Sequence, residues 1–301
     1  MTTSKKLNKS DNSGDFLTKQ LFGVDSGLTL SFDRIQYDYK NKRYIIFDHI
    51  LINSDIKSIN DLSKESQLQI KKLNKFKNIL KNRTSQPVDL FVSFFFPVEQ
   101  NQDKVFLFNG ENIKKYSLPS FSFNFKHLNF LGNKDNSNMT FLDEKENSDI
   151  INERREDNSS FSFTKAILNN DYTYGFNLDN VVFRGDGFDI YEYLLCEESQ
   201  KVNPYTSHPN KYFYKNSQKF ISLFELSKES KSNLYLINYA KTGTIHSEKV
   251  LFMKLLNINK DSKKAVVTDD RKTTLDKLKT AIKKRYGIEN IKNPIKIRSY
   301  K

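Results

Sequence analysis

The chain has 301 residues, of which 28% are charged and 37% hydrophobic, and its formal net charge is +13. It contains no apolar run near the roughly 20 residues that a membrane-spanning helix needs, which excludes an integral helical membrane protein. Cys196 is the only cysteine, so a disulfide within the chain is excluded, and a reducing, cytoplasmic location is expected. The length suits two domains, each able to bury a core.

The first half of the chain predicts a small α/β domain. Residues 1–14 lack the apolar stretch of a secretory signal and are expected to form a disordered leader. Alternation of apolar and polar residues indicates strands, and the helical spacing of Ile70, Leu73, Phe76 and Leu80 indicates an amphipathic helix. The predicted elements are a helix at 16–22, strands at 28–33 and 44–52, a helix at 62–82 and strands at 88–97 and 104–108.

An aromatic-rich stretch follows at 116–131, containing Phe121, Phe123, Phe125 and Phe130. It has no counterpart in the second half of the chain. We favour packing across a domain interface over stacking on bases, and the stretch from Phe121 to Phe130 is also a candidate surface for a protein partner. Residues 132–160 are polar and mostly acidic, which is typical of a linker.

The second half repeats the first with an offset of 144 to 146 residues. The hairpin around Asp25 to Leu51 returns at Asp171 to Glu198, with Asp33 matching Asp179 and Asp48 matching Glu192. Chance matches would not keep one offset, so we interpret the pattern as a tandem duplication. We expect two similar domains of the α/β (α+β) class, each a mixed central sheet flanked by helices in the order α-β-β-α-β-β. The expected boundaries are a first repeat at 15–131, a linker at 132–160, a second repeat at 161–259 and a basic helical tail at 260–301.

The net positive charge is concentrated in that tail. Residues 260–301 contain fourteen Lys and Arg against five Asp and Glu. A helix is predicted at 273–286, and a basic tail suits a polyanion such as nucleic acid. The candidate nucleic-acid contacts are Lys279, Lys283, Lys284 and Arg285; the alternative is a solvated helix in a lysine-rich chain.

The acids of the second hairpin are the candidate site. Glu192 shares a strand face with Ile190 and Leu194 and should point toward the core. A buried carboxylate is costly unless something binds it. It could bind a metal, or it could pair with a buried lysine or a backbone amide.

An acid at the end of one strand and a second acid in the next, followed by an amphipathic helix and another buried strand, resembles the PD-(D/E)XK nuclease family, the restriction-endonuclease-like fold. The resemblance implies that Asp179 and Glu192, and equally Asp33 and Asp48, bind Mg²⁺. Carboxylates on adjacent strands make a hard oxygen site for Mg²⁺, which stabilises charge on a phosphodiester.

The family's lysine, two residues after the second acid, is missing here, because Leu194 and Ile50 occupy those positions. Some members of the fold take the lysine from the following helix instead. Lys215 and Lys219, four residues apart, lie on one helix face and match Lys71 and Lys75 of the first repeat. They are the candidates for that role, and an ordinary solvated face is the alternative.

The sequence therefore predicts a DNA-binding protein with tandem nuclease-like domains and Mg²⁺-dependent endonuclease activity, with Asp179, Glu192, Lys215 and Lys219 as catalytic residues. One alternative is an inactive subunit that keeps the fold and binds nucleic acid or takes part in an assembly. A second is a structural, protein-binding module.

Overall fold

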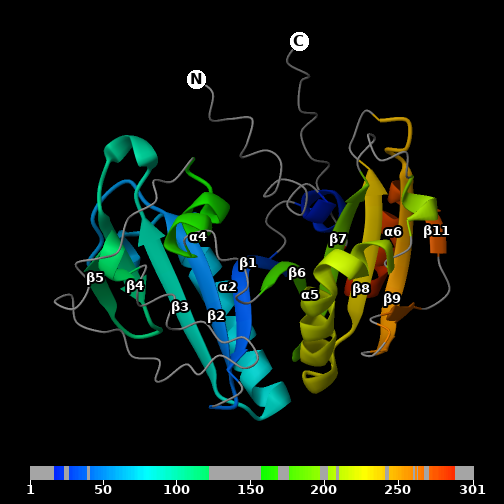
Figure 1. Cartoon of the computed structure of the whole chain (residues 1–301), viewed down its shortest axis with the longest axis horizontal. Helices are drawn as coiled ribbons and strands as arrows, with labels where there is room; N and C mark the ends of the chain where they lie inside the picture. The colour runs from blue at the N-terminus through cyan, green and yellow to red at the C-terminus, as the bar shows by residue number, and fades with distance from the viewer. Residues whose placement is uncertain are drawn as a thin grey trace. The chain divides into compact units, whose positions relative to one another are not determined.

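A computed structural model gives the fold of the chain (Figure 1). The structure describes residues 17–23, 27–38, 41–121, 157–168, 176–196, 203–207, 210–240, 244–259, 262, 264–267 and 271–288. The expected leader at 1–14, the linker as far as residue 156 and the aromatic residues Phe123, Phe125 and Phe130 lie outside these ranges.

The described elements form two compact mixed α/β units, whose composition differs from the two halves of the sequence. One unit contains residues 32–177, and the other contains residues 12–31 together with 178–301. The helix over residues 17–22 therefore belongs to the second unit, although it begins the first repeat. Conversely, helix α4 (Ser160–Leu168), which begins the second repeat, belongs to the first unit.

The first unit is built on a mixed sheet with the strand order β1-β2-β3-β4-β5. β1 and β2 form an antiparallel hairpin, α2 then crosses over, and β3 returns parallel to β2. β4 and β5 complete the sheet in antiparallel pairing. The bounds are β1 Thr29–Asp38, β2 Arg43–Leu51, α2 Lys64–Thr84, β3 Val88–Phe95, β4 Lys104–Phe108 and β5 Ile113–Ser117.

The sheet of the first unit has helical cover on both faces. α2 buries one stripe made of Ile70, Leu73, Phe76 and Leu80. The opposite face carries a core in which Phe163 and Ile167 of α4 pack with Ile45 and Phe47 of β2. Phe121 also belongs to this core and is fully buried, so this member of the aromatic stretch is used in packing within the unit.

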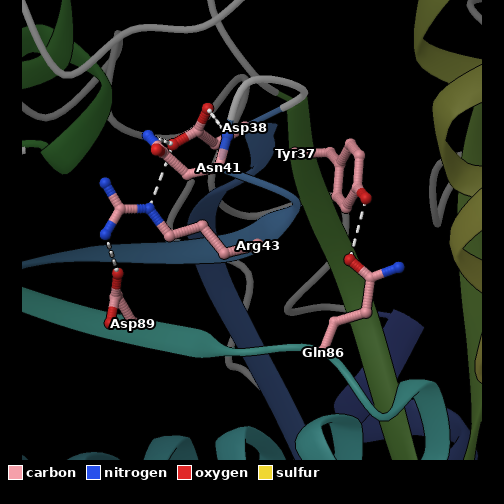
Figure 2. Close-up of polar contacts among 6 residues, drawn as sticks. All are labelled: Tyr37, Asp38, Asn41, Arg43, Gln86 and Asp89. Carbon is pink, nitrogen blue, oxygen red and sulfur yellow. Dashed lines mark hydrogen bonds and ion pairs between the residues drawn. The ribbon is translucent and has the colours of Figure 1, made fainter. Parts of the chain in front are cut away.

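A polar cluster fixes the turn end of the first hairpin (Figure 2). The side chain of Asp38 is fully buried and accepts hydrogen bonds from Asn41 and from Arg43 Nε at 3.0 Å. Arg43 Nη1 also donates to Asp89 Oδ2 at 3.0 Å. The guanidinium of Arg43 thus joins the end of β1 to the beginnings of β2 and β3. Tyr37 Oη also donates a hydrogen bond to Gln86 Oε1.

The second unit repeats the same strand plan, with the order β6-β7-β8-β9-β10 and β11 on the other part of β9. β6 and β7 form the hairpin, joined by a tight turn in which Gly185 has a φ of 54°. α5 crosses over to β8, which is parallel to β7. The bounds are β6 Phe176–Arg184, β7 Gly187–Cys196, α5 Asn210–Glu229, β8 Leu234–Ala240, β9 Lys249–Asn259, β10 Lys264–Val267, β11 Arg271–Thr274 and α6 Leu275–Tyr286.

The second sheet also has two different faces. One face carries the helix over residues 17–22 and α6, whose Leu17, Leu21, Leu278 and Ile282 share a core with Tyr191 of β7. Thr18 Oγ1 also donates to Tyr193 Oη at 3.1 Å. Glu192 lies between these two tyrosines on β7, so its side chain points to the opposite face, where α5 lies.

The tail contains more sheet than expected, because β10 and β11 precede its helix. The helix begins after the N-cap Thr274, whose side chain accepts from Lys277 N, and ends at Gly287 in the left-handed conformation, as the sequence predicts. Within the described part of the chain, no helix combines the length and apolar character that crossing a bilayer requires.

Candidate active site in the second unit

The acid pair of the second unit lies just beyond the paired part of the β6–β7 hairpin. Asn180 pairs with Tyr191, and the next residues outward are Asp179 and Glu192. There the backbone N–H of Tyr193 donates to Asp179 Oδ2 at 2.8 Å. The carboxylate of Asp179 therefore accepts a backbone hydrogen bond from β7, which fixes it beside Glu192.

The first unit has the same arrangement at its own acid pair. Arg34 pairs with Phe47, and the next residues are Asp33 and Asp48. The backbone N–H of His49 donates to Asp33 Oδ2 at 2.9 Å. Acids that the sequence matches by offset thus occupy the same register and make the same backbone contact.

Lys219 of α5 completes the arrangement in the second unit. Its Nζ contacts Glu192 Oε1 directly and lies 3.9 Å from Asp179 Oδ1. The side chain of Glu192 is only 4% exposed, and those of Asp179 and Lys219 are 15% and 22% exposed. Two carboxylates and one ammonium group therefore meet at the edge of the core, and Lys219 is a residue that the sequence nominated.

Burial dominates the electrostatics of this cluster. It raises the pKa of Glu192 to about 8, the charge of Asp179 adds to the rise, and Lys219 opposes it. Burial lowers the pKa of Lys219, but the charges of Glu192 and Asp179 outweigh it, so that the pKa lies above its usual value. Glu192 Oε2 is buried and has no hydrogen-bond partner. An oxygen left in this state is costly, so the site has an unmet need for a donor or a cation.

The acids of the first unit are bound by neutral groups. Gln69 Nε2 of α2 donates to Asp48 Oδ2 at 2.9 Å, and Ser160 Oγ at the start of α4 donates to Asp33 Oδ1 at 2.7 Å. Burial, and then the charge of Asp33, raise the pKa of Asp48 well above its usual value. The first pair is thus contacted by neutral donors, where the second pair has an ammonium group.

The other nominated lysines are placed differently. Lys75, which matches Lys219 in sequence, is exposed on α2, and so is Lys71. Gln69 is the α2 side chain that reaches Asp48. Lys215 is in α5, but its side chain lies outside the described part of the structure.

Asn238 is a polar residue of this face that the sequence analysis missed. It is fully buried on β8, beside Leu194 of β7, and so follows Glu192 by one step along the same face. Its Nδ2 donates to the carbonyl of Ser207, while its Oδ1 is buried without a hydrogen-bond partner. The signal was an asparagine in an otherwise apolar strand, at the position where the first repeat has Phe94.

The candidate nucleic-acid residues of α6 fall into two groups. Lys284 is exposed, and Lys279 and Lys283 are partly exposed. Arg285 Nη2 instead donates to the fully buried Asp189 at 3.0 Å, and its guanidinium lies 5.1 Å over the ring of Tyr235. Arg285 therefore anchors the helix to the sheet, and the three lysines remain the surface candidates.

The residues that could hold a divalent cation are the two acids of the second unit. Among the described residues, no group of three or more His, Cys, Asp and Glu is arranged around one point. Mg²⁺ needs only one or two carboxylates when water and substrate oxygens supply its other ligands. Asp179 and the unsatisfied Glu192 Oε2 fit that requirement.

Comparison with known proteins returned no match to a family model, to a curated protein or to a solved structure.

Proposed function

We propose that the second unit is a Mg²⁺-dependent phosphodiesterase acting on nucleic acid, with DNA as the expected substrate. The observation that supports this function is the contact of Lys219 with the buried acid pair Asp179 and Glu192. The sequence lacks a lysine two residues after Glu192, and α5 supplies one at the same acid.

Glu192 Oε2, which is buried and has no hydrogen-bond partner, would hold the cation together with the carboxylate of Asp179. Tyr193 N donates to Asp179 Oδ2, and Lys219 contacts Glu192 Oε1. When bound, Mg²⁺ would neutralise charge on a phosphodiester and make a bound water more acidic.

The chain's own groups have separate roles in this proposal. Lys219 Nζ presents N–H donors and a positive charge beside the acids, where a phosphate oxygen or an attacking water can be oriented. Tyr193 N holds the Asp179 carboxylate in one orientation, so that little reorganisation is needed on binding. Glu192, buried on the sheet face, anchors Lys219 through an ion pair.

The first unit is assigned no chemistry in this proposal. Gln69 and Ser160 already donate to its two acids, and burial raises the pKa of Asp48 well above its usual value. The first acid pair is therefore already contacted by neutral donors, whereas Glu192 of the second pair is contacted by an ammonium group.

The test is cleavage of plasmid DNA and of labelled oligonucleotides with Mg²⁺ or Mn²⁺, comparing Glu192→Gln with Asp48→Asn. These are matched variants, because each removes the second acid of one repeat. We expect Glu192→Gln to lose at least about 100-fold, the scale of one preorganised electrostatic group, and Asp48→Asn to keep its activity. Equal loss in both variants, or undiminished cutting by an Asp179→Ala, Glu192→Ala double variant, would contradict the site.

A second measurement separates metal binding from catalysis. Mn²⁺ binding, followed by electron paramagnetic resonance, should weaken in Glu192→Gln and remain in Asp48→Asn.

One observation favours a second candidate, a nucleic-acid-binding subunit without catalysis. Lys219 Nζ already contacts Glu192 and lies 3.9 Å from Asp179, in a position where its positive charge could replace that of a metal ion. This candidate predicts salt-sensitive DNA binding with no cleavage and no Mn²⁺ binding, and loss of DNA binding when the chain is cut after residue 260.

A further inference from the structure

A basic pocket lies in the second unit between α6 and the strands β9 and β11. It has a volume of about 260 Å³, and its polar and aromatic lining includes Arg271, Thr273, Lys277, Arg285, Tyr191 and Phe252. Its remaining lining residues are apolar, and no acid is among them. Tyr191 and Glu192 are adjacent on β7, so this pocket and the acid pair lie on opposite faces of the sheet.

Arg285 is held in place at this pocket by groups behind it. Asp189, which is fully buried, accepts from Arg285 Nη2 at 3.0 Å and from Tyr286 Oη at 2.7 Å. Tyr235 and Tyr286 also lie against the guanidinium, at 5.1 and 5.7 Å from their ring centroids. A guanidinium fixed on one edge can still donate from its other nitrogens, at little cost in side-chain entropy.

The charge of the pocket comes from residues that remain exposed. Asp189 balances Arg285, whereas Arg271 and Lys277 project from β11 and α6 at the rim. Phe252, stacked on Tyr235 at 5.0 Å, supplies an apolar wall. The volume is below the 300 Å³ or more that is usual for drug-sized ligands, so the occupant must be small.

We propose that this pocket binds a phosphate monoester, with the phosphate between Arg271, Lys277 and Arg285 and its organic part against Phe252. A phosphate monoester matches a cationic pocket because it carries up to two negative charges and three acceptor oxygens. The same chemistry occurs in a free nucleotide and at the phosphorylated end of a nucleic-acid strand.

The experiment is isothermal titration calorimetry of the full chain with adenosine 5′-monophosphate and with inorganic phosphate at low salt. The test variant is Arg271→Gln with Lys277→Gln, and the control is Lys264→Gln with Lys272→Gln. Each variant removes two exposed positive charges from the second unit, but only the first pair lines the pocket. We expect one saturable site per chain, weakened at least tenfold in the test variant and unchanged in the control, since hydrogen bonds to charged groups dominate such sites.

A second variant guards against misfolding of the first. Ala281→Glu adds a carboxylate to the lining from an exposed helical position and should abolish binding without changing the melting temperature. Equal weakening in test and control variants, binding that survives Ala281→Glu, or no saturable binding would overturn the proposal.

Two oligonucleotides of one sequence distinguish the sources of the phosphate. If the 5′-phosphorylated strand binds more tightly than the 5′-hydroxyl strand, and only with the pocket intact, the pocket recognises a strand end. Equal affinity of the two strands, with adenosine monophosphate still bound, identifies a free nucleotide as the ligand.

Discussion

Gln69 of α2 and Lys219 of α5 contact equivalent buried acids but bring different charges to them. Gln69 Nε2 donates to Asp48 Oδ2 at 2.9 Å, whereas Lys219 forms an ion pair with Glu192. A neutral donor brings no charge to the first acid pair, whereas an ammonium group lies against the second pair and opposes the rise in the pKa of Glu192. The two units thus differ in which helix side chain reaches the matching acids, because Lys75, which matches Lys219 in sequence, is exposed and Gln69 takes its place.

Lys219→Met should lower the free energy of unfolding by roughly 3 kcal/mol, because breaking a buried ion pair leaves the other charge unpaired. Urea unfolding above pH 8, where the Glu192 carboxylate is ionised, measures this loss. Adding Glu192→Gln to the variant should recover part of it, and Lys75→Met, at an exposed position, should change stability by no more than about 0.5 kcal/mol. Simple additivity of the Lys219 and Glu192 substitutions would contradict the coupling.

Asp48→Asn should make the protein more stable at pH 7. Burial raises the pKa of Asp48 in the folded state, so the wild type loses stability as the pH rises from about 4 toward that raised pKa. Asparagine carries no charge, and its amide can donate to Asp33 as the protonated acid does. Denaturation curves of the two proteins should converge near pH 4, and a less stable variant at pH 7 would refute the assignment.

His49 should destabilise the protein in acid. Burial, chiefly, lowers its pKa from 6.5 to about 4, with Arg34 adding to the effect and Asp33 opposing it. Because the folded-state pKa is depressed, the stability is present above pH 6.5 and is lost as the pH falls toward 4, by about 3 kcal/mol. His49→Gln, which keeps a polar group near Ser93, should remove this dependence in a series of unfolding curves.

Arg43→Met should destabilise the first hairpin, because Asp38 is fully buried and would lose its cation. The expected cost is about 3 kcal/mol, measured by urea unfolding. Arg43→Lys tests the geometry, since an ammonium group cannot match the fork that reaches both Asp38 and Asp89. Full stability of the lysine variant would show that charge alone suffices.

Cutting the chain between its sequence repeats should prevent folding. A fragment of residues 1–145 lacks Phe163 and Ile167, which complete the core of the first unit. A fragment of residues 27–177 includes both residues. From the first repeat it leaves out the helix over residues 17–22, which packs in the second unit. We expect cooperative thermal unfolding, followed by circular dichroism, for the fragment 27–177 and not for the fragment 1–145. Cooperative unfolding of 1–145 would show that the first unit does not need α4.

Periodicity predicted most elements closely, because strands and amphipathic helices each bury one stripe. β4 begins and ends at the expected residues, and α2 starts two residues later than expected. β10 and β11 were missed, since the sequences KAVV and RKTT are too short and too charged to show alternation. An apolar stripe also does not indicate which sheet it covers. The sequence therefore could not predict that the helix over residues 17–22 packs in the second unit and α4 in the first.

The candidate site was predictable in part for the same reason. Repetition identified the four acids, and helical spacing nominated Lys219. The sequence pattern could not show that Gln69 would contact the acid of the first unit, because the rotation of a helix over a sheet depends on its whole packed face. Asn238 escaped because one polar residue does not change the pattern of a buried strand.

The helix over residues 17–22 is synthesised early, yet it finds its partners late. Thr18 bonds to Tyr193, which is 175 residues further along the chain, and Leu17 and Leu21 pack on strands made after α4. During synthesis the first unit can close while this helix still has an exposed apolar face. Contacts of such long range slow folding and extend the period of exposure. This short helix therefore exposes apolar side chains on the nascent chain until the strands of the second unit have been made.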